Sequence, residues 1–172
     1  VRPRKGLPVL LKATHMLPAE SNIHLLLVGK GMDSEEIQEL IKSSPMANRI
    51  HITGFRRDAP AIIAACNASV LASTKREGLP KTVIESMAYG VAPIVSDTGG
   101  SAELIEDGIS GIRVTPGSAE EIANAILRLH QSEDECSLMG QKAKERIESH
   151  FHVEQSAREL YKVLEETIND AF

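Results

Sequence analysis

The sequence lacks the excess of positive charge that nucleic-acid-binding proteins need. Its 19 lysines and arginines are outnumbered by 24 aspartates and glutamates, which gives a formal net charge of −5. A protein that binds DNA or RNA through the phosphate backbone presents a basic surface. We therefore expect no nucleic-acid partner.

Cysteine and long apolar runs are also scarce. Cys66 and Cys136 are too few for a disulfide framework and lack the spacing of zinc ligands. None of the six histidines has the spacing of a helical metal pair, so no metal site is expected. No apolar run approaches the roughly 18 residues of a transmembrane helix, and no charged-then-apolar leader opens the sequence. We expect a soluble, cytoplasmic protein.

The 172 residues, 42% of them hydrophobic, suffice for one domain with a buried core. No low-complexity segment, linker-like tract or repeat divides them. The sequence starts at Val1 and leads directly into R-P-R-K-G, so we expect an excised piece of a longer protein.

Short unbroken apolar runs alternate with stretches of helical periodicity. Such runs indicate parallel strands that are covered on both faces. The expected strands are Ile23 to Val28, Arg49 to Thr53, Ser69 to Ser73, Pro93 to Ser96 and Gly111 to Val114. The expected helices are Leu7 to Leu17, one capped by Asp33 or Ser34, one started by Asp58 and Pro60, Pro80 to Tyr89, Ser101 to Glu106, Ala119 to Gln131, Asp134 to Ser149 and Val153 to Asn169. This alternation predicts an α/β fold, a Rossmann-like doubly wound parallel sheet with extra C-terminal helices.

The loop from Thr74 to Thr82 is the strongest candidate for a ligand site. In an open parallel sheet the ligand lies beyond the carboxyl ends of the strands. Here Pro80 starts a helix with Lys81 in its first turn, and the free N–H groups of a helix start attract anions. We expect a phosphate there, with Lys5 and either Arg2 or Arg4 as cationic partners.

Two glutamates flank this helix start. Glu85 lies four residues after Lys81, about one turn, and therefore faces the same loop. A carboxylate beside a phosphate is better suited to accepting hydrogen bonds from neutral hydroxyls, such as those of a ribose. Glu77 precedes the helix and is expected to reach hydroxyls on the other side of the phosphate.

These residues belong to a longer pattern, E-G-L-P-x4-E-S-M-A-x-G-x-x-P-I-V-x-x-D-x-G-G-x-x-E-L-I-x-D-G-x-x-G. It closely resembles the C-terminal, donor-binding domain of retaining GT-B glycosyltransferases of the group-1 type. The stretches R-K-G-L-P-V-L-L-K-A and L-L-L-V-G-K-G resemble the opening of that domain. The resemblance therefore covers essentially the whole chain.

The resemblance implies transfer of a sugar from a nucleotide diphosphate sugar with retention of configuration and without a metal or cofactor. Glu85 would hold the ribose hydroxyls, and Glu77 would contact the donor sugar at the catalytic centre. Lys5 would stabilise the departing diphosphate, and Phe55 would lie near the base. Further donor contacts would come from Gly78, Leu79, Lys81 and Thr82.

Several neighbouring residues have a structural interpretation as well as a functional one. Gly99 and Gly100 either let a backbone approach the donor sugar or supply the positive dihedrals of a turn. Gly29–Lys30–Gly31 is expected to be only a tight turn, Arg56 and Arg57 a solvated pair, and Glu103 a brace for its own helix. An apolar stripe on the last helix packs either on this domain or, as the resemblance implies, on another one; its members are Val153, Ala157, Leu160, Tyr161, Leu164 and Ile168.

The family's first strand, which is central in a doubly wound sheet, and its N-terminal acceptor domain would both precede Val1. We therefore expect the fragment to be inactive alone, and any association with a membrane to occur through the absent domain. The alternative function is a non-catalytic nucleotide- or sugar-binding module. A third possible function is that of a GT-B epimerase or phosphorylase relative, but the stretch from Glu77 to Pro80 disfavours it.

Overall fold

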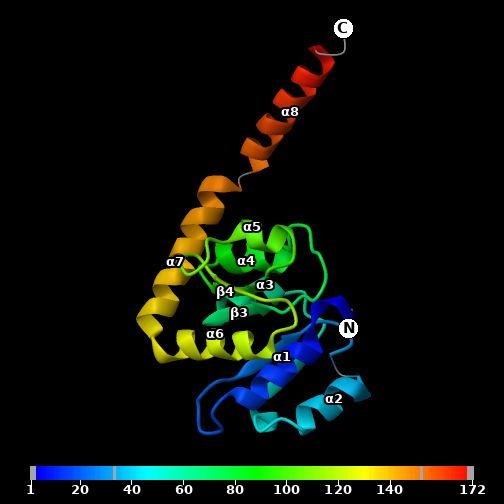
Figure 1. The fold of residues 1–172 in the computed structure, drawn as a ribbon, viewed down its shortest axis with the longest axis vertical. Coiled ribbons are helices and arrows are strands. Elements are labelled where there is room, and N and C mark those ends of the chain that lie inside the picture. The colour runs from blue at the N-terminus through cyan, green and yellow to red at the C-terminus, as the bar shows by residue number, and fades with distance from the viewer. Residues whose placement is uncertain (1–2, 33, 152, 170–172) are drawn as a thin grey trace.

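The structure is a computed structural model that describes residues 3–32, 34–151 and 153–169 (Figure 1). Strands and helices alternate up to residue 114, and helices alone follow. The strands are β1 (Leu25–Val28), β2 (Ile50–Gly54), β3 (Ala68–Leu71), β4 (Ala92–Ser96) and β5 (Ile112–Val114). The α-helices are α1 (Leu7–Ala13), α2 (Glu35–Lys42), α3 (Ala59–Ala64), α4 (Lys81–Ala88), α5 (Gly100–Leu104), α6 (Ala119–Gln131), α7 (Glu133–His150) and α8 (Val153–Asn169). Short 3-10 turns cover Pro3–Lys5, Thr14–Met16 and Ala47–Arg49.

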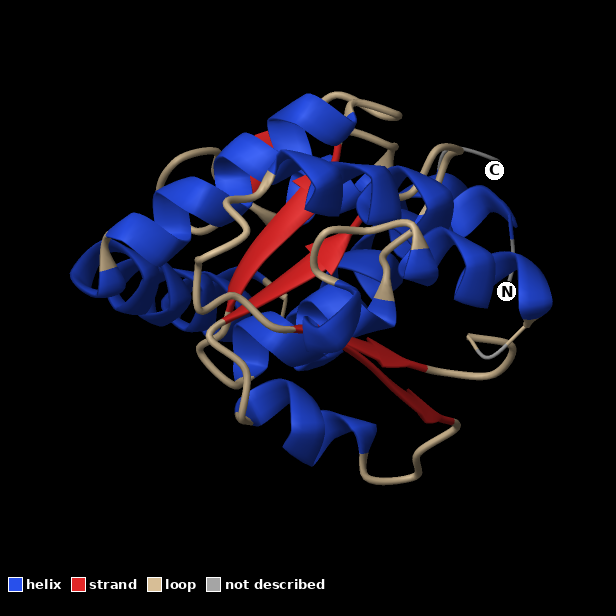
Figure 2. Ribbon diagram, turned by 90° about the horizontal axis from the view of Figure 1, so that it is seen from below, coloured by secondary structure: helices blue, strands red, loops and turns tan. Residues whose placement is uncertain are grey.

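All strand pairs are parallel, which confirms the predicted α/β class, but the strands form two sheets instead of one. β1 pairs with β2, and β3, β4 and β5 form a second sheet in that order. Within the described residues no hydrogen-bonded ladder joins the two groups, and Figure 2 shows them as separate sets of strands. The structure therefore divides the expected continuous sheet.

The burial of a strand depends on how many strand neighbours it has in its sheet. All five residues of β4 are buried, because β4 has a strand on each side and helices over both faces. Its Ile94 packs in one apolar cluster with residues of α1 and α6, and its Val95 packs in another with residues of α4 and α7. Leu26 of β1 is exposed, so the expectation that this strand is covered on both faces is wrong. Among the described residues, the strand pairs only with β2.

Most helices begin and end within two residues of the predicted positions, but α1 ends at Ala13, with a 3-10 turn after it, instead of reaching Leu17. Two serine caps explain the starts of α6 and α7. Ser118 precedes α6 and accepts a hydrogen bond from the N–H of Glu121 (3.2 Å), and Ser132 does the same for Glu135 at the start of α7 (3.2 Å). A serine followed three residues later by a glutamate is a strong helix start. Ser34 precedes α2, and Asp33 lies outside the described residues.

The predicted inward face of α3 is only partly correct. Ile62, Ile63 and Cys66 are half-buried, whereas Ala65 is exposed. The helix ends at Ala64, so Ala65 and Cys66 lie beyond it instead of on its apolar face.

The last helix extends away from the body of the domain (Figure 1). Leu160, Tyr161, Leu164 and Ile168 are 52 to 65% exposed, and Ala157 is exposed too. The interpretation that this stripe packs on the domain's own sheet is therefore wrong; the side chain of Val153 lies outside the described residues. In the described part of the chain, no helix is long and apolar enough to span a membrane.

Candidate functional site

The loops that follow β3 and β4 are tied together at the carboxyl end of the second sheet. The N–H of Glu77 donates to the carbonyl of Thr98 (3.2 Å), and the N–H of Gly100 donates to the carbonyl of Glu77 (3.1 Å). These bonds form a short parallel bridge between Glu77 and Gly99. Because both strands end at the same edge, the two sequence regions around Glu77 and Gly100 form one surface.

Gly99 and Gly100 make this close approach possible. Gly99 has a φ of +66°, which L side chains rarely adopt, and a Cβ on it would lie 2.7 Å from the carbonyl oxygen of Glu77. A Cβ on Gly100 would lie 2.4 Å from the carbonyl oxygen of Gly78. The glycines therefore serve both the turn and a close backbone contact, and the contact is with the Glu77 loop. An approach to a donor sugar stays a prediction.

An open pocket of about 460 Å³ lies between these loops. Its volume is in the range of small-molecule sites. It is lined by Arg76, Glu77, Gly78, Leu79, Gly100 and Glu103. Four of these residues are predicted site residues, and they come from the two loops just described.

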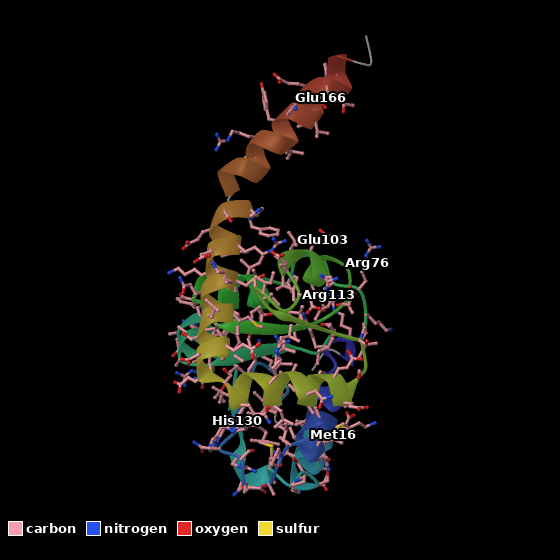
Figure 3. All side chains as sticks on the ribbon, turned by 60° about the vertical axis from the view of Figure 1, so that its left-hand side comes forward. Met16, Arg76, Glu103, Arg113, His130 and Glu166 are labelled. Atoms are coloured by element: carbon pink, nitrogen blue, oxygen red, sulfur yellow. The ribbon has the colours of Figure 1, made fainter. Side chains whose placement is uncertain are left out.

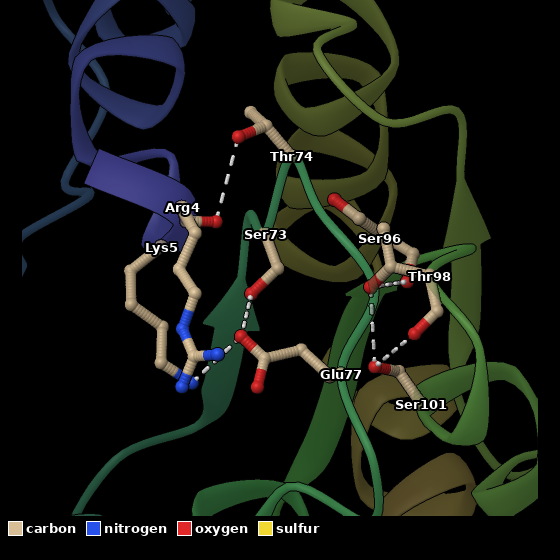
Figure 4. A network of polar contacts seen from close by, with 8 residues as sticks. All are labelled: Arg4, Lys5, Ser73, Thr74, Glu77, Ser96, Thr98 and Ser101. Atoms are coloured by element: carbon tan, nitrogen blue, oxygen red, sulfur yellow. Dashed lines mark hydrogen bonds and ion pairs between the residues drawn. The ribbon is translucent and has the colours of Figure 1, made fainter. Parts of the chain in front are cut away.

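Glu77 is the buried carboxylate of this site, with 8% of its surface exposed. Its Oε1 accepts a hydrogen bond from Oγ of Ser73 (3.0 Å) and lies 3.0 Å from Nζ of Lys5 (Figure 4). Burial alone would raise the pKa of Glu77, but the hydrogen bonds from Lys5 and Ser73 and the positive charges of Lys5 and Arg4 hold the pKa below its ordinary value. The carboxylate is therefore ionised at neutral pH and acts only as an acceptor.

The segment before α1 is fixed against the end of β3. The carbonyl of Arg4 accepts a hydrogen bond from the N–H of Thr74 (2.8 Å). Gly6 lies so close to the backbone of Ala72 that any Cβ would overlap its carbonyl oxygen. Lys5 is thereby brought to Glu77 from a distant part of the sequence. Arg2, the other proposed cationic partner, lies outside the described residues.

The start of α4 has the predicted form. Pro80 occupies the N-cap position, and Lys81 and Thr82 form the first turn. The first N–H groups of a helix have no acceptor within it, so they remain available to an anion. Glu85, 22% exposed, follows on the same helix with its Oε1 3.4 Å from Nζ of Lys81. Neither Lys81 nor Glu85 lines the pocket itself.

Phe55 lies apart from this pocket, after β2 in the other sheet. The residue is 61% exposed, and Nζ of Lys30 lies 5.4 Å from the centroid of its ring. Both residues follow the carboxyl ends of their own strands, β1 and β2. Lys30 belongs to a turn, as predicted. Arg56 forms two hydrogen bonds with the carboxylate of Asp58 (2.7 and 2.6 Å) and lowers the pKa of that carboxyl to about 2.

Two pocket residues were not among the sequence predictions. Arg76 adds a cation directly before Glu77, and the only sequence signal for it is the basic pair Lys75–Arg76. Glu103 lines the pocket, although it was expected to brace its own helix. Figure 3 shows both on one side of the domain body, with Arg113 nearby. Among the described residues, no cluster of three or more His, Cys, Asp or Glu could hold a metal ion.

Comparison with known proteins gives a consistent result. Residues 1–146 match the family described as glycosyl transferases group 1. An uncharacterized glycosyltransferase of Methanocaldococcus jannaschii is 31% identical over 170 residues, which are 96% of this chain and 43% of that protein.

Solved structures agree with this match. HepE of Anabaena in complex with UDP is 27% identical with a TM-score of 0.86, over 95% of this chain and 46% of that one. The same protein has been solved with UDP-glucose. The C-terminal domain of LpcC, a glycosyl transferase group 1 family protein of Francisella tularensis, shares the fold with a TM-score of 0.78 at 22% identity, over 89% of this chain and 83% of that domain. The chain thus spans less than half of the full-length relatives compared here.

Proposed function

The chain belongs to the glycosyl transferases group 1 family, and on that premise we propose that it is the donor-binding lobe of a retaining glycosyltransferase. In this role it holds a nucleotide diphosphate sugar while the sugar passes to an acceptor such as a glycan or a lipid-linked glycan. The reaction uses neither a metal nor a further cofactor. The complexes of HepE with UDP and UDP-glucose, at 27% identity, support a nucleotide-sugar ligand.

The state of Glu77 carries this proposal. Its Oε1 is occupied by Ser73 and Lys5, whereas no contact to Oε2 is present among the described residues. An ionised carboxylate with one oxygen fixed and the other free can accept a hydrogen bond from a sugar hydroxyl without reorienting. Because Glu77 lines the pocket, the sugar of the donor lies there.

The diphosphate lies between Lys5 and the start of α4. The ammonium of Lys5 has three donors, so it can contact a phosphate while it stays near Glu77. The free N–H groups at Lys81 and Thr82 provide further donors. Glu85 holds the ribose hydroxyls, and the exposed ring of Phe55 lies near the base.

The reaction follows from positioning and charge. As the bond between sugar and diphosphate breaks, negative charge grows on the leaving phosphate, and Lys5 and the helix N–H groups stabilise it. The leaving phosphate takes the proton of the acceptor hydroxyl on the same face of the sugar, so configuration is retained. The lobe supplies orientation and electrostatic stabilisation instead of a nucleophile.

The division between the sheets supports a second part of the proposal. Among the described residues, β1 and β3 each have one strand partner, and the N–H of Thr74, just beyond β3, is bonded to the carbonyl of Arg4 at the start of the described chain. A further parallel strand from the same polypeptide, between β1 and β3, joins the two groups into one sheet. The N-terminal acceptor domain of the cytoplasmic enzyme precedes it, and any contact with a membrane is made through that domain.

Nucleotide titration tests the proposed function. UDP, GDP and ADP are added to the 172-residue chain and to Glu85→Ala, and binding is followed by thermal shift and NMR. One nucleotide should bind saturably, and Glu85→Ala should weaken it by about tenfold or more, because a charged hydrogen bond is lost. Glu39→Ala is the matched control, since Glu39 also pairs with a lysine one turn away on an exposed helix, Lys42. Failure of all three nucleotides to bind would contradict the proposal for this chain.

A further inference from the structure

The helix that carries one wall of the pocket is very short. α5 consists of five residues, and two of them, Gly100 and Glu103, line the pocket. A single helical turn is unstable by itself, so its position depends on the groups that hold its two ends. Its first end is fixed by the bond from the N–H of Gly100 to the carbonyl of Glu77.

The other end of α5 is held by arginines from distant elements. Nε of Arg146, on α7, donates to the carbonyl of Leu104 (2.8 Å), and Nη2 donates to the carbonyl of Glu103 (3.1 Å). Nη2 of Arg113, on β5, reaches the carbonyl of Ala102 (3.3 Å). The last carbonyls of a helix lack partners within it and attract cations. Two arginines therefore complete the end of α5.

Arg146 is itself fixed in place. Its neighbour Ile147 packs in the same apolar cluster as Leu104, which is fully buried, so α7 and the end of α5 share one core. The ring of Phe151, 6.0 Å from the guanidinium, lies at the end of α7. Arg146 does not line the pocket. It reaches the wall of the pocket through its hydrogen bonds to α5.

We propose that Arg146 is a positioning residue for the nucleotide-sugar pocket. Its guanidinium donates hydrogen bonds to the carbonyls of Glu103 and Leu104. These bonds fix the positions of Gly100 and Glu103 in the pocket wall. The inference rests on the proposed function, because that function gives the pocket its ligand. The inference adds that a residue of α7, outside the pocket, fixes the wall of the pocket that faces the sugar.

Comparison of UDP with UDP-glucose tests the role of Arg146. We expect Arg146→Met to weaken UDP-glucose binding by about five- to tenfold and UDP binding by less than twofold. The reason is that the Glu77 and Gly100 region faces the sugar, whereas UDP lacks the sugar. Arg146→Lys retains one charged donor and should recover part of the loss. Arg128→Met is the matched control, since Arg128 on α6 also bonds to a residue of α7, Glu135, and among the described residues it has no hydrogen bond to α5.

Equal weakening of UDP and UDP-glucose in proportion to a fall in melting temperature would identify Arg146 as merely structural and overturn the inference. Unchanged binding of both would overturn it as well. If the wild-type chain binds neither ligand, the proposed function fails, and hydrogen exchange then decides the inference separately. Faster exchange in Arg146→Met that is confined to the amides of residues 100–104 would support it. Exchange at the wild-type rate would contradict it.

Discussion

Lys5 and Glu77 form an ion pair of 3.0 Å between the segment before α1 and the loop before α4. Glu77 is nearly buried, whereas Lys5 keeps 36% of its side chain exposed. The pair connects the first described residues to the edge where the strands end, and Ser73 supports it from β3's end. One carboxylate thereby takes part in the stability of the fold and in the proposed chemistry.

This pair makes the stability of the chain depend on pH. The pKa of Glu77 in the folded state lies below the ordinary glutamate value of 4.5, so the folded state binds the proton less readily than the unfolded chain does. The contribution of Glu77 is therefore complete above about pH 4.5 and declines as the pH falls through the folded-state pKa. Urea unfolding of wild type and Glu77→Gln between pH 3 and 7 should show a steeper loss of the free energy of unfolding towards acid for wild type. Parallel acid losses in the two proteins would contradict this role of Glu77.

Two neighbouring glycines that line the pocket, Gly78 and Gly100, should respond differently to alanine. A Cβ on Gly100 would lie 2.4 Å from the oxygen and 2.8 Å from the carbon of the Gly78 carbonyl, so the backbone must move. We expect Gly100→Ala to lower the free energy of unfolding by about 1 to 3 kcal/mol. A Cβ on Gly78 would meet no atom within 4 Å. Gly78→Ala should therefore change the free energy of unfolding by less than about 0.5 kcal/mol. Equal losses in chemical denaturation would refute this description of the loop contact.

Gly140 tests the contact between α7 and the end of α4. In an isolated helix Gly→Ala would stabilise by about 1 kcal/mol. Here a Cβ would lie 2.0 Å from the carbonyl oxygen of Gly90, which belongs to the backbone and cannot rotate away. Gly140→Ala should therefore lower the melting temperature, at a cost of about 1 to 3 kcal/mol. Ser137→Ala, at an exposed position of the same helix, should leave it unchanged or raise it slightly.

The exposed stripe of α8 should contribute little to the stability of the isolated chain. Leu164 is 52% exposed, whereas Ile122 in α6 is fully buried. Leu164→Ala should change the free energy of unfolding by less than about 0.5 kcal/mol, whereas Ile122→Ala should cost about 2 to 5 kcal/mol. A large loss for Leu164→Ala in denaturant titrations would mean that α8 packs on this domain in solution.

The sequence was informative where the structural signal is local. α6 and α8 have the predicted bounds, and α7 differs by one residue at each end. Their periodic apolar patterns extend over several turns, and Ser118 is a recognisable N-cap for α6. The start of α4 at Pro80 and the parallel strands were also predictable, because single residues or short apolar runs specify them.

Features that depend on distant neighbours were not predictable in the same way. The exposure of Leu26 follows from which strands pair, and one strand's sequence does not contain that information. Glu103 lines the pocket from α5, whose ends contact Glu77 and Arg146, and the residues around Glu103 in the sequence contain neither contact. The pairing of Lys5 with Glu77 likewise arises from the fold. The sequence pattern singled out both residues as candidates, whereas the contact between them is visible only in the structure.

The division between β1 and β3 also predicts which part of the molecule unfolds most readily. Separating the β1–β2 group from the rest breaks side-chain packing around α1 but no strand ladder among the described residues. Proteins open in cooperative units whose free energies differ. The β1–β2 group, with α2 attached, should therefore unfold transiently at a lower free energy than β4, which has strands on both sides. Lys30 and Phe55 belong to the first unit and Glu77 to the second, so a nucleotide that spans both would hold the two units together.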